Sequence, residues 1–150
     1  MRIYLDLCCF NRPYDDQGQT RIRLETEAKL VLQQKIKDKS CELVWSAILD
    51  YENWRNPFKE RLLAIRQWRQ LAISMVMADT SVVARARTIM AIGITSYDAL
   101  HVASAIAGEA NVFVTTDDKL LKHLRRMSDL ELRAAPPGEA LAILEQWYEN

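Results

Sequence analysis

The chain has 150 residues, and its 20 basic and 20 acidic side chains give a formal net charge of zero. This balance excludes a protein that binds polyanions through its overall charge, and the length fits one domain. A hydrophobic content of 49% allows a sizeable core and argues against disorder.

The cysteines and the apolar runs bear on where the protein works. Cys8 and Cys9 are adjacent, Cys41 stands alone, and none has the spacing of a zinc site. Reduced thiols in the cytoplasm are the natural interpretation. The N-terminal residues lack the apolar core of a signal peptide, and no apolar run approaches about 20 residues. We therefore expect a soluble cytoplasmic protein without a membrane segment.

The first third of the chain predicts two strands and two helices. Residues 2–7 form a short apolar run typical of a buried strand, and residues 8–19, with Pro13 and Gly18, are expected to form a loop. Apolar side chains at spacings of three and four predict an amphipathic helix over residues 21–37. Residues 42–45 predict a second strand, and Ser46 is a suitable N-cap for a helix that reaches about residue 55.

The middle of the chain is expected to be helical. Apolar positions between residues 58 and 77 form a long stripe with helical spacing. Asp79 or Thr80 is expected to cap a helix that reaches about residue 90. A further helix is expected to open at Thr95 and Ser96 and to cover residues 97–107.

The last third predicts two more strands and two more helices. We expect strands at residues 111–115 and 130–133, a helix at residues 118–127, and a final helix ending near residue 148. Short, continuous apolar strands that alternate with helices are typical of a parallel sheet covered on both faces. The expected fold is a single α/β domain over residues 1–150, with a parallel sheet of about four or five strands between helices.

Four acidic residues are candidates for the carboxyl edge of the sheet, where sheets of this kind bind ligands, although no strand is predicted directly before Asp98. Asp6 ends the first strand, Glu52 lies in the helix after the second, Asp98 opens a later helix, and Asp117 follows the third strand. Helix capping alone would explain Asp98 and Asp117. Asp6 interrupts an apolar strand, where an unpaired charge is unfavourable.

A cluster of such acids requires a counter-charge. Two carboxylates about 4 Å apart repel by roughly 4 kcal/mol at an effective dielectric of 20. A hard dication such as Mg²⁺ or Mn²⁺ prefers oxygen ligands, and acid clusters that bind such ions hydrolyse phosphodiesters. In this interpretation Asp117 is placed for a metal, while Asp118 is free to cap the next helix or to orient a water.

Taken in order, these residues resemble the PIN domain family, which includes the toxin ribonucleases of bacterial toxin–antitoxin pairs. The matching motifs are IYLD, ending in Asp6, WSAILDYE with Glu52, SYDALHVASA with Asp98, and VFVTTDDKLL with Asp117. The resemblance implies an endoribonuclease that hydrolyses single-stranded RNA with Mg²⁺ or Mn²⁺. It implies Asp6, Asp98 and Asp117 as metal ligands, with Glu52 completing the catalytic acidic pocket. An antitoxin protein and a second copy of the chain are the partners that it suggests.

Two departures from the family keep a second hypothesis open. Cys8 stands where the family often has Ser, Thr or Asn, and the segment that follows it is longer than usual. A catalytically weak or inactive PIN-fold module that binds RNA or protein is therefore the alternative. Asp50 competes with Glu52 as the helical acid, but residues two apart on a helix cannot both face one pocket.

Other α/β classes fit less well. A receiver domain needs an acidic pair after the first strand and a later lysine near a strand end, in an order that this sequence lacks. A Rossmann nucleotide enzyme needs GxGxxG, which does not occur. A phosphoaspartyl hydrolase needs Asp-x-Asp, and the corresponding residues are Asp6, Leu7 and Cys8.

Arginines and tryptophans are candidates for RNA contact, with ordinary structural roles as the alternative for each. His101 is expected to have a structural role rather than a catalytic one. Arg12 is the arginine nearest to the first strand edge. The other candidates are Arg61, Arg66, Arg69, Arg85, Arg87, Trp45, Trp54, Trp68 and Trp147.

Overall fold

The computed structural model describes residues 1–149, with side chains described through residue 146. The elements run in the order β1 (Arg2–Leu5), α1 (Leu7–Asn11), a 3₁₀ turn (Arg12–Tyr14), α2 (Thr20–Lys37), β2 (Glu42–Ser46), α3 (Ala47–Trp54), α4 (Lys59–Arg66), a second 3₁₀ turn (Gln67–Leu71), β3 (Ser74–Val76), α5 (Thr80–Met90), α6 (Ser96–Ala107), β4 (Val112–Val114), α7 (Asp118–Arg125), β5 (Arg133–Ala135) and α8 (Pro137–Glu149).

All strands of the sheet are parallel, in the order β3-β2-β1-β4-β5. The central strand is β1, in which Tyr4 lies opposite Val44 of β2 and Phe113 of β4. The chain moves outward from β1 through β2 to β3 and then crosses to the other side of β1 to form β4 and β5. Strand order therefore reverses between β1 and β4, and open parallel sheets bind ligands at such a switch point.

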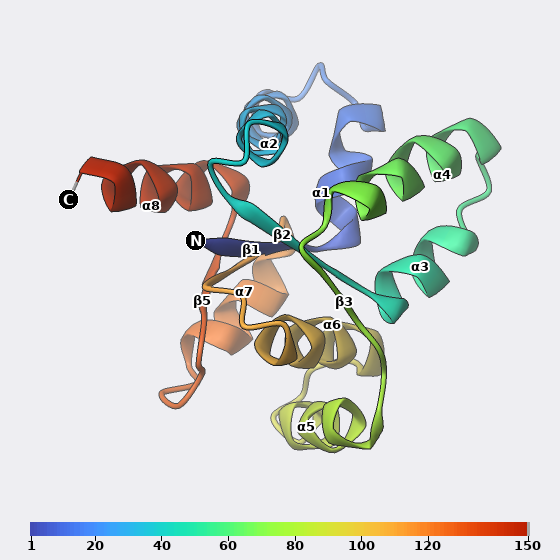
Figure 1. Ribbon diagram of the computed structural model, residues 1–150, viewed down its shortest axis with the longest axis vertical. Coiled ribbons are helices and arrows are strands. Elements are labelled where there is room, and N and C mark those ends of the chain that lie inside the picture. The colour runs from blue at the N-terminus through green and yellow to red at the C-terminus, as the bar shows by residue number, and fades with distance from the viewer. Residues whose placement is uncertain (150) are drawn as a thin grey trace.

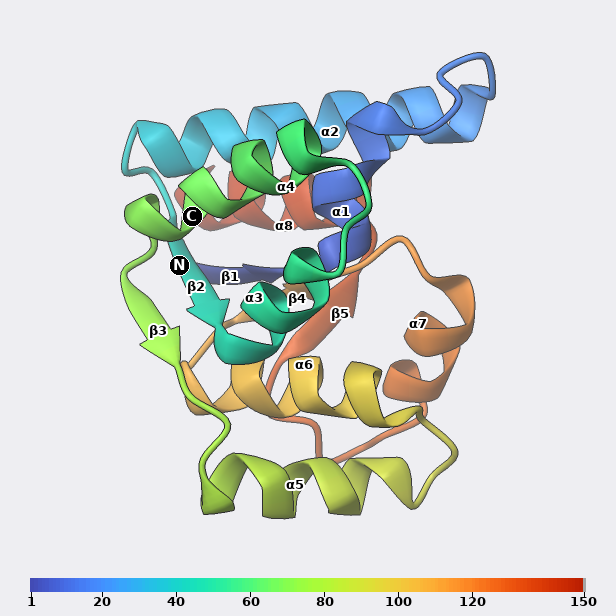
Figure 2. The ribbon, with the colours of Figure 1, turned by 90° about the vertical axis from the view of Figure 1, so that its right-hand side faces the viewer.

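Helices cover both faces of the sheet, as Figure 1 and Figure 2 show. One face carries α1, α2, α4 and α8, and the other carries α7 and α6, with α5 outside α6. Tyr4, Val44 and Phe113 at the centre of the sheet have no exposed surface. Because these strands are buried on both faces, their sequences are continuously apolar. The predicted fold class, an α/β domain with a parallel sheet between helices, is confirmed.

Local side-chain contacts set the ends of several helices. Ser46 Oγ accepts a hydrogen bond from the Leu49 N–H at 3.2 Å, and Asp79 Oδ1 accepts one from the Val82 N–H at 2.9 Å. Both N-caps are as predicted. At the other end of α6, a Cβ on Gly108 would lie 2.4 Å from Val44 Cγ1, so only glycine allows this helix to end so close to β2.

The predicted loop over residues 8–19 is wrong, because α1 and the first 3₁₀ turn occupy most of it. The Asp6 carboxylate accepts a hydrogen bond from the Leu7 N–H at 2.8 Å and so caps α1 directly after the strand. Pro13 lies in the first turn of the 3₁₀ segment, where its missing N–H is not needed.

Two other predicted elements are corrected. The helix expected over residues 58–77 ends at Arg66, and β3 follows the second 3₁₀ turn. This strand was missed because it lies at the edge of the sheet, where Met75 and its neighbours are only partly covered and the apolar run is not fully buried. The strand expected at residues 130–133 begins at Arg133, because Phe113 of β4 pairs with Ala134.

None of the helices in the described part of the chain is long and apolar enough to cross a membrane.

Candidate active site

The candidate site lies at the carboxyl edge of the sheet, around the switch point between β1 and β4. Asp6 follows β1, and Asp117 follows β4. Glu52 lies on α3, which follows β2, and Asp98 lies in the first turn of α6. Four elements that are far apart in the sequence therefore supply the predicted acids.

Asp6 is only 7% exposed, and hydrogen bonds hold both of its carboxylate oxygens. Oδ1 accepts from the Leu7 N–H at 2.8 Å, and Oδ2 accepts from the Thr115 hydroxyl at 2.9 Å. A buried carboxylate requires such donors, and these two fix its position between β1 and β4.

Cys8 contributes to this corner of the site through its sulfur. The Cys8 Sγ lies 3.5 Å from Asp6 Oδ2 and 3.4 Å from the Thr115 hydroxyl oxygen, and it accepts a hydrogen bond from the Thr116 N–H at 3.3 Å. The thiol therefore joins α1 to the end of β4. No hydrogen bond links Asn11 to the acids among the described residues, and its Oδ1 is buried without a partner.

A buried chain of hydrogen bonds positions Glu52. The Tyr4 hydroxyl oxygen lies 2.6 Å from both Ser46 Oγ and His101 Nδ1. On the other side of the imidazole, Nε2 bonds to Glu52 Oε1 and lies 3.8 Å from Asp6 Oδ1. Ser46, Tyr4 and His101 have no exposed surface, so the chain crosses the core beneath the acids.

The neutral imidazole with its proton on Nε2 satisfies every group in this chain. The Leu49 N–H donates to Ser46, and the Ser46 hydroxyl donates to Tyr4. The Tyr4 hydroxyl donates to His101 Nδ1, and the Nε2–H donates to Glu52. His101 has the structural role expected from the sequence, and it reaches both Glu52 and Asp6.

Opposing effects act on the imidazole. Burial lowers the pKa of His101, but the hydrogen bond to Glu52 and the negative charges of Asp6, Glu52 and Asp98 outweigh burial, so that the pKa is raised. The imidazole is the cationic group available to these acids when it takes up a second proton.

The same charges act on Asp98. Burial and the negative charges of Asp6 and Asp117 raise the pKa of Asp98, against the lowering effects of a hydrogen bond with Thr95 and of His101. Thr95 makes no side-chain capping hydrogen bond to α6, so the capping box expected here is not formed. The negative charges of Asp6 and Asp117 therefore both act on the Asp98 carboxyl group and disfavour its ionisation.

Asp117 and Asp118 have separate roles. Asp117 caps α7, because its Oδ1 accepts from the Lys119 and Leu120 N–H groups at 3.0 and 3.1 Å. Asp118 makes a two-point ion pair with Arg21, at 2.7 and 2.8 Å. Asp117 therefore performs the capping at the end of β4, and the charge of Asp118 is neutralised by Arg21 of α2.

The acids of the candidate site differ from most other acids of the protein because they lack an arginine partner. Arginines pair with Asp15, Glu25, Asp50, Asp118, Glu131 and Glu139. Among the described residues, Asp6, Asp98 and Asp117 have no lysine or arginine partner. Asp50 bonds to Trp45 and Arg69, and Glu52 is the acid of α3 that bonds to His101.

Oxygen donors without a counter-charge suit a hard dication in their chemistry. Within the chain as far as its side chains are described, however, no three His, Cys, Asp or Glu side chains are grouped closely enough to hold a metal ion.

Sequence reasoning missed the groups that support the acids. In the sequence, Tyr4 was assigned only to an apolar strand. Thr115 was assigned only to the end of the strand before Asp117. A polar side chain within an apolar strand was the available signal for Tyr4, since a buried hydroxyl needs a partner. Arg12, the first candidate for RNA contact, is instead engaged with Glu25 at 2.8 Å and Asp15 at 3.1 Å.

The parallel sheet and its acidic switch point define an α/β protein with a candidate ligand site at the carboxyl edge. The sequence of residues 16–127 matches the PIN domain family. The chain therefore belongs to this family, whose members are generally nucleases. Glu52, Asp98 and Asp117 fall inside the matched segment, and Asp6 precedes it. No curated protein sequence gives a significant match.

Solved structures with a similar fold include two complexes. VapBC2 from Rickettsia felis, bound to a DNA fragment from its promoter, has a chain that matches with 17% identity and a TM-score of 0.53, over 89% of this chain and 98% of that one. DNA-bound VapBC from Salmonella typhimurium gives 18% identity and a TM-score of 0.51, over 91% and 98%. At these identities the likeness supports the fold.

Proposed function

We propose that the protein is a Mg²⁺- or Mn²⁺-dependent endoribonuclease that cleaves single-stranded RNA in the cytoplasm. The observation that carries the proposal is the set of three carboxylates, Asp6, Asp98 and Asp117, near the switch point without a lysine or arginine partner among the described residues. Membership of the PIN domain family supports nuclease activity. The three unpaired cysteines agree with a reducing compartment.

In this proposal Asp6, Asp98 and Asp117 hold the ion, and Glu52 completes the acidic pocket. A bound dication of this kind polarises the phosphodiester and provides an activated water. Thr115 fixes the Asp6 carboxylate, and the chain from Tyr4 through His101 fixes Glu52. The protein's own contribution is therefore to hold negatively charged oxygens in place before RNA and metal arrive.

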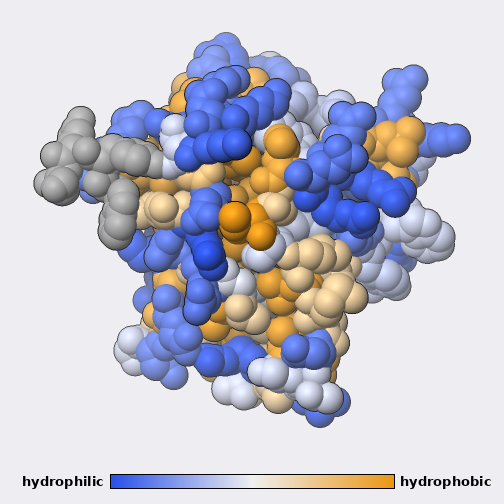
Figure 3. All heavy atoms as spheres, viewed as in Figure 1, coloured by the Kyte–Doolittle hydropathy of each residue, from blue (hydrophilic) through white to orange (hydrophobic). Residues whose placement is uncertain are grey.

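We further propose that the chain is the toxin of a toxin–antitoxin pair. The matched VapBC complexes support an antitoxin partner. Exposed apolar side chains offer a surface for it, and Figure 3 shows hydrophobic residues gathered over β3. Ile73, Met75 and Met77 there are 54%, 40% and 61% exposed. A second copy of the chain is the other proposed partner for this surface.

The test is cleavage of a fluorescent single-stranded RNA with Mg²⁺ or Mn²⁺, stopped by a chelator. Loss of a metal ligand exceeds the roughly 10–100-fold effect of losing a group behind one, so Asp98→Asn and Asp6→Asn should each reduce the rate by at least about a hundredfold. Asp118→Asn is the matched control and should cleave like the parent. Equal rates for Asp98→Asn and the parent, with both folded by circular dichroism, would refute the proposal.

A PIN-fold module that binds RNA or protein without cleaving it is the second candidate, because no metal-binding group is assembled among the described side chains. Calorimetric titration with Mn²⁺ separates the two candidates. The nuclease should bind the ion, and Asp98→Asn should weaken that binding. Binding that is absent in the parent would favour the module.

A further inference from the structure

A cleft of about 310 Å³ opens between α3 and α4, a short distance along α3 from Glu52. Its size falls at the lower end of the range of small-molecule sites. Asn53 is 2% exposed, and its Nδ2 donates to the Leu62 carbonyl oxygen at 3.0 Å. This bond ties the two helices together, so the cleft is formed without a ligand.

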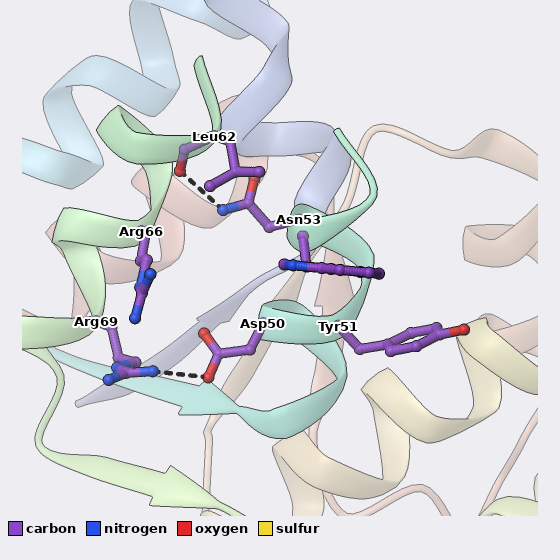
Figure 4. A pocket seen from close by; sticks show the side chains of 7 residues that line it. Asp50, Tyr51, Asn53, Leu62, Arg66 and Arg69 are labelled. Carbon is purple, nitrogen blue, oxygen red and sulfur yellow. Dashed lines mark hydrogen bonds and ion pairs between the residues drawn. The ribbon is translucent and has the colours of Figure 1, made fainter. Parts of the chain in front are cut away.

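Two arginines point into the cleft from the side of α4 and face α3, as Figure 4 shows. Arg69 makes an ion pair with Asp50 at 3.0 Å, and the other Asp50 oxygen accepts from Trp45 Nε1 at 2.9 Å. Both Asp50 oxygens are thus engaged by other donors. Arg66 makes no ion pair within the described part of the chain. A guanidinium that is exposed and unpaired beside a cleft suits a phosphate group.

The opposite wall of the cleft is aromatic. Trp54 is 74% exposed and Tyr51 is 46% exposed, although large aromatic rings are usually buried for most of their area. Tyr51 turns away from the arginines and packs edge-on against Tyr97, with ring centroids 5.9 Å apart. Exposed aromatic faces are the usual platforms on which single-stranded nucleic acids stack their bases.

This aromatic surface joins the two helices that carry Glu52 and Asp98, since Tyr51 lies on α3 and Tyr97 on α6. Tyr51 immediately precedes Glu52, and Tyr97 immediately precedes Asp98. From there the surface continues to Trp54 and the cleft. The arginines Arg66 and Arg69 also line a second hollow of about 350 Å³ on the far side of the cleft.

We propose that this cleft binds one unpaired nucleotide of the RNA strand next to the scissile phosphate. Trp54 stacks on the base, and Arg66 binds a backbone phosphate. A nucleotide carries both a phosphate and an aromatic base, which matches the unpaired guanidinium and the exposed rings better than a protein side chain does. The inference rests on the proposed ribonuclease function, and it assigns the residues that position the strand beside the acids.

Binding of a short fluorescein-labelled single-stranded RNA, followed by fluorescence anisotropy in a chelator so that the RNA stays intact, tests the inference. Trp54→Ala should weaken binding by about tenfold, and Trp54→Phe should restore most of the affinity. Arg66→Gln should reduce the slope of log Kd against log salt by about 0.7, the effect of losing one phosphate contact to a single strand. Trp54→Ala should leave that slope unchanged.

Arg23→Gln is the matched control, because Arg23 is exposed on α2 and has no ion pair in the described part of the chain. Equal weakening by Arg66→Gln and Arg23→Gln would mean that only overall charge matters and would overturn the inference. Unchanged RNA affinity in Trp54→Ala would also overturn it. So would a change confined to self-association in sedimentation, since the cleft would then belong to a protein contact.

Cleavage by the parent chain is measured separately. If the parent binds RNA through Trp54 and Arg66 but does not cleave it, the nuclease proposal fails and the binding site stands. If the parent cleaves RNA while the Trp54 and Arg66 variants keep its affinity and KM, the cleft assignment fails and the nuclease proposal stands.

Discussion

Replacing Lys29 should remove a pH dependence that this one side chain adds to the stability of the protein. Lys29 lies on α2, is 4% exposed, and has no carboxylate partner in the described part of the chain. Its ammonium lies 5.4 Å from the centre of the Phe10 ring. Burial lowers the pKa of Lys29 from 10.5 to about 8.

Because the folded pKa is below the unfolded one, the unfolded chain binds more protons between these values, and stability rises with pH in that window. Each unit of pKa shift corresponds to about 1.36 kcal/mol, so Lys29 should add about 2–3 kcal/mol to the free energy of unfolding between pH 7 and pH 10. Burial of the cysteine thiols raises the pKa of Cys9 and brings the pKa of Cys41 to about 11, so these groups act in the opposite direction above pH 9.

Comparison with Lys29→Met isolates the lysine, since the thiols are common to both chains. Urea unfolding, followed by circular dichroism at pH 7, 8, 9 and 10, gives the difference in free energy of unfolding between the parent and the variant. That difference should move in favour of the parent by about 2–3 kcal/mol as the pH rises. Lys37→Met, an exposed position on the same helix, should show no such trend. A difference between the parent and Lys29→Met that stays constant within about 0.5 kcal/mol would refute the reasoning.

Three further substitutions test contacts described above. Tyr4→Phe leaves Ser46 and His101 without a buried hydrogen-bond partner and should lower the free energy of unfolding by about 2–4 kcal/mol in urea titrations. A loss below about 0.5 kcal/mol would contradict the hydrogen-bond chain. Gly108→Ala should destabilise by about 1–3 kcal/mol in thermal unfolding, because the new methyl group would overlap Val44, and an unchanged Tm would argue against that close approach. Asp79→Ala should lower the urea midpoint by the equivalent of about 1 kcal/mol, whereas Asp79→Asn should retain most of the capping stability. Equal midpoints for the two variants would count against a stabilising N-cap at this position.

Features determined by neighbouring residues could be predicted from the sequence. Ser46 and Asp79 cap the helices expected of them, since a cap depends on three or four consecutive residues. The buried strands could be predicted because both of their faces are apolar. The edge strand β3 could not, because its partly exposed residues also fit a helical stripe.

Contacts between distant residues were beyond the reach of sequence patterns. Tyr4 and His101 are separated by 97 residues and Cys8 and Thr116 by 108, and nothing local to either member indicates its partner. Asp98 follows α5 rather than a strand, so strand ends alone could not place it. Asp6 and Asp117 could be predicted at one edge because strand ends in a parallel sheet share an edge. Their role as metal ligands stays a prediction, and the chain that orients Glu52 became visible only in three dimensions.

The close fit of Gly108 against the sheet has a consequence for the acids at the opposite end of α6. The helix runs from Ser96 to Ala107, about 18 Å, and behaves as a stiff rod with Asp98 and His101 near its start. At the C-terminal end of α6, Gly108 packs directly against Val44 and Val76, and this contact limits movement of the helix along the sheet. Repacking around Gly108 would therefore shift Asp98 relative to Asp6, although the two positions lie at opposite ends of α6.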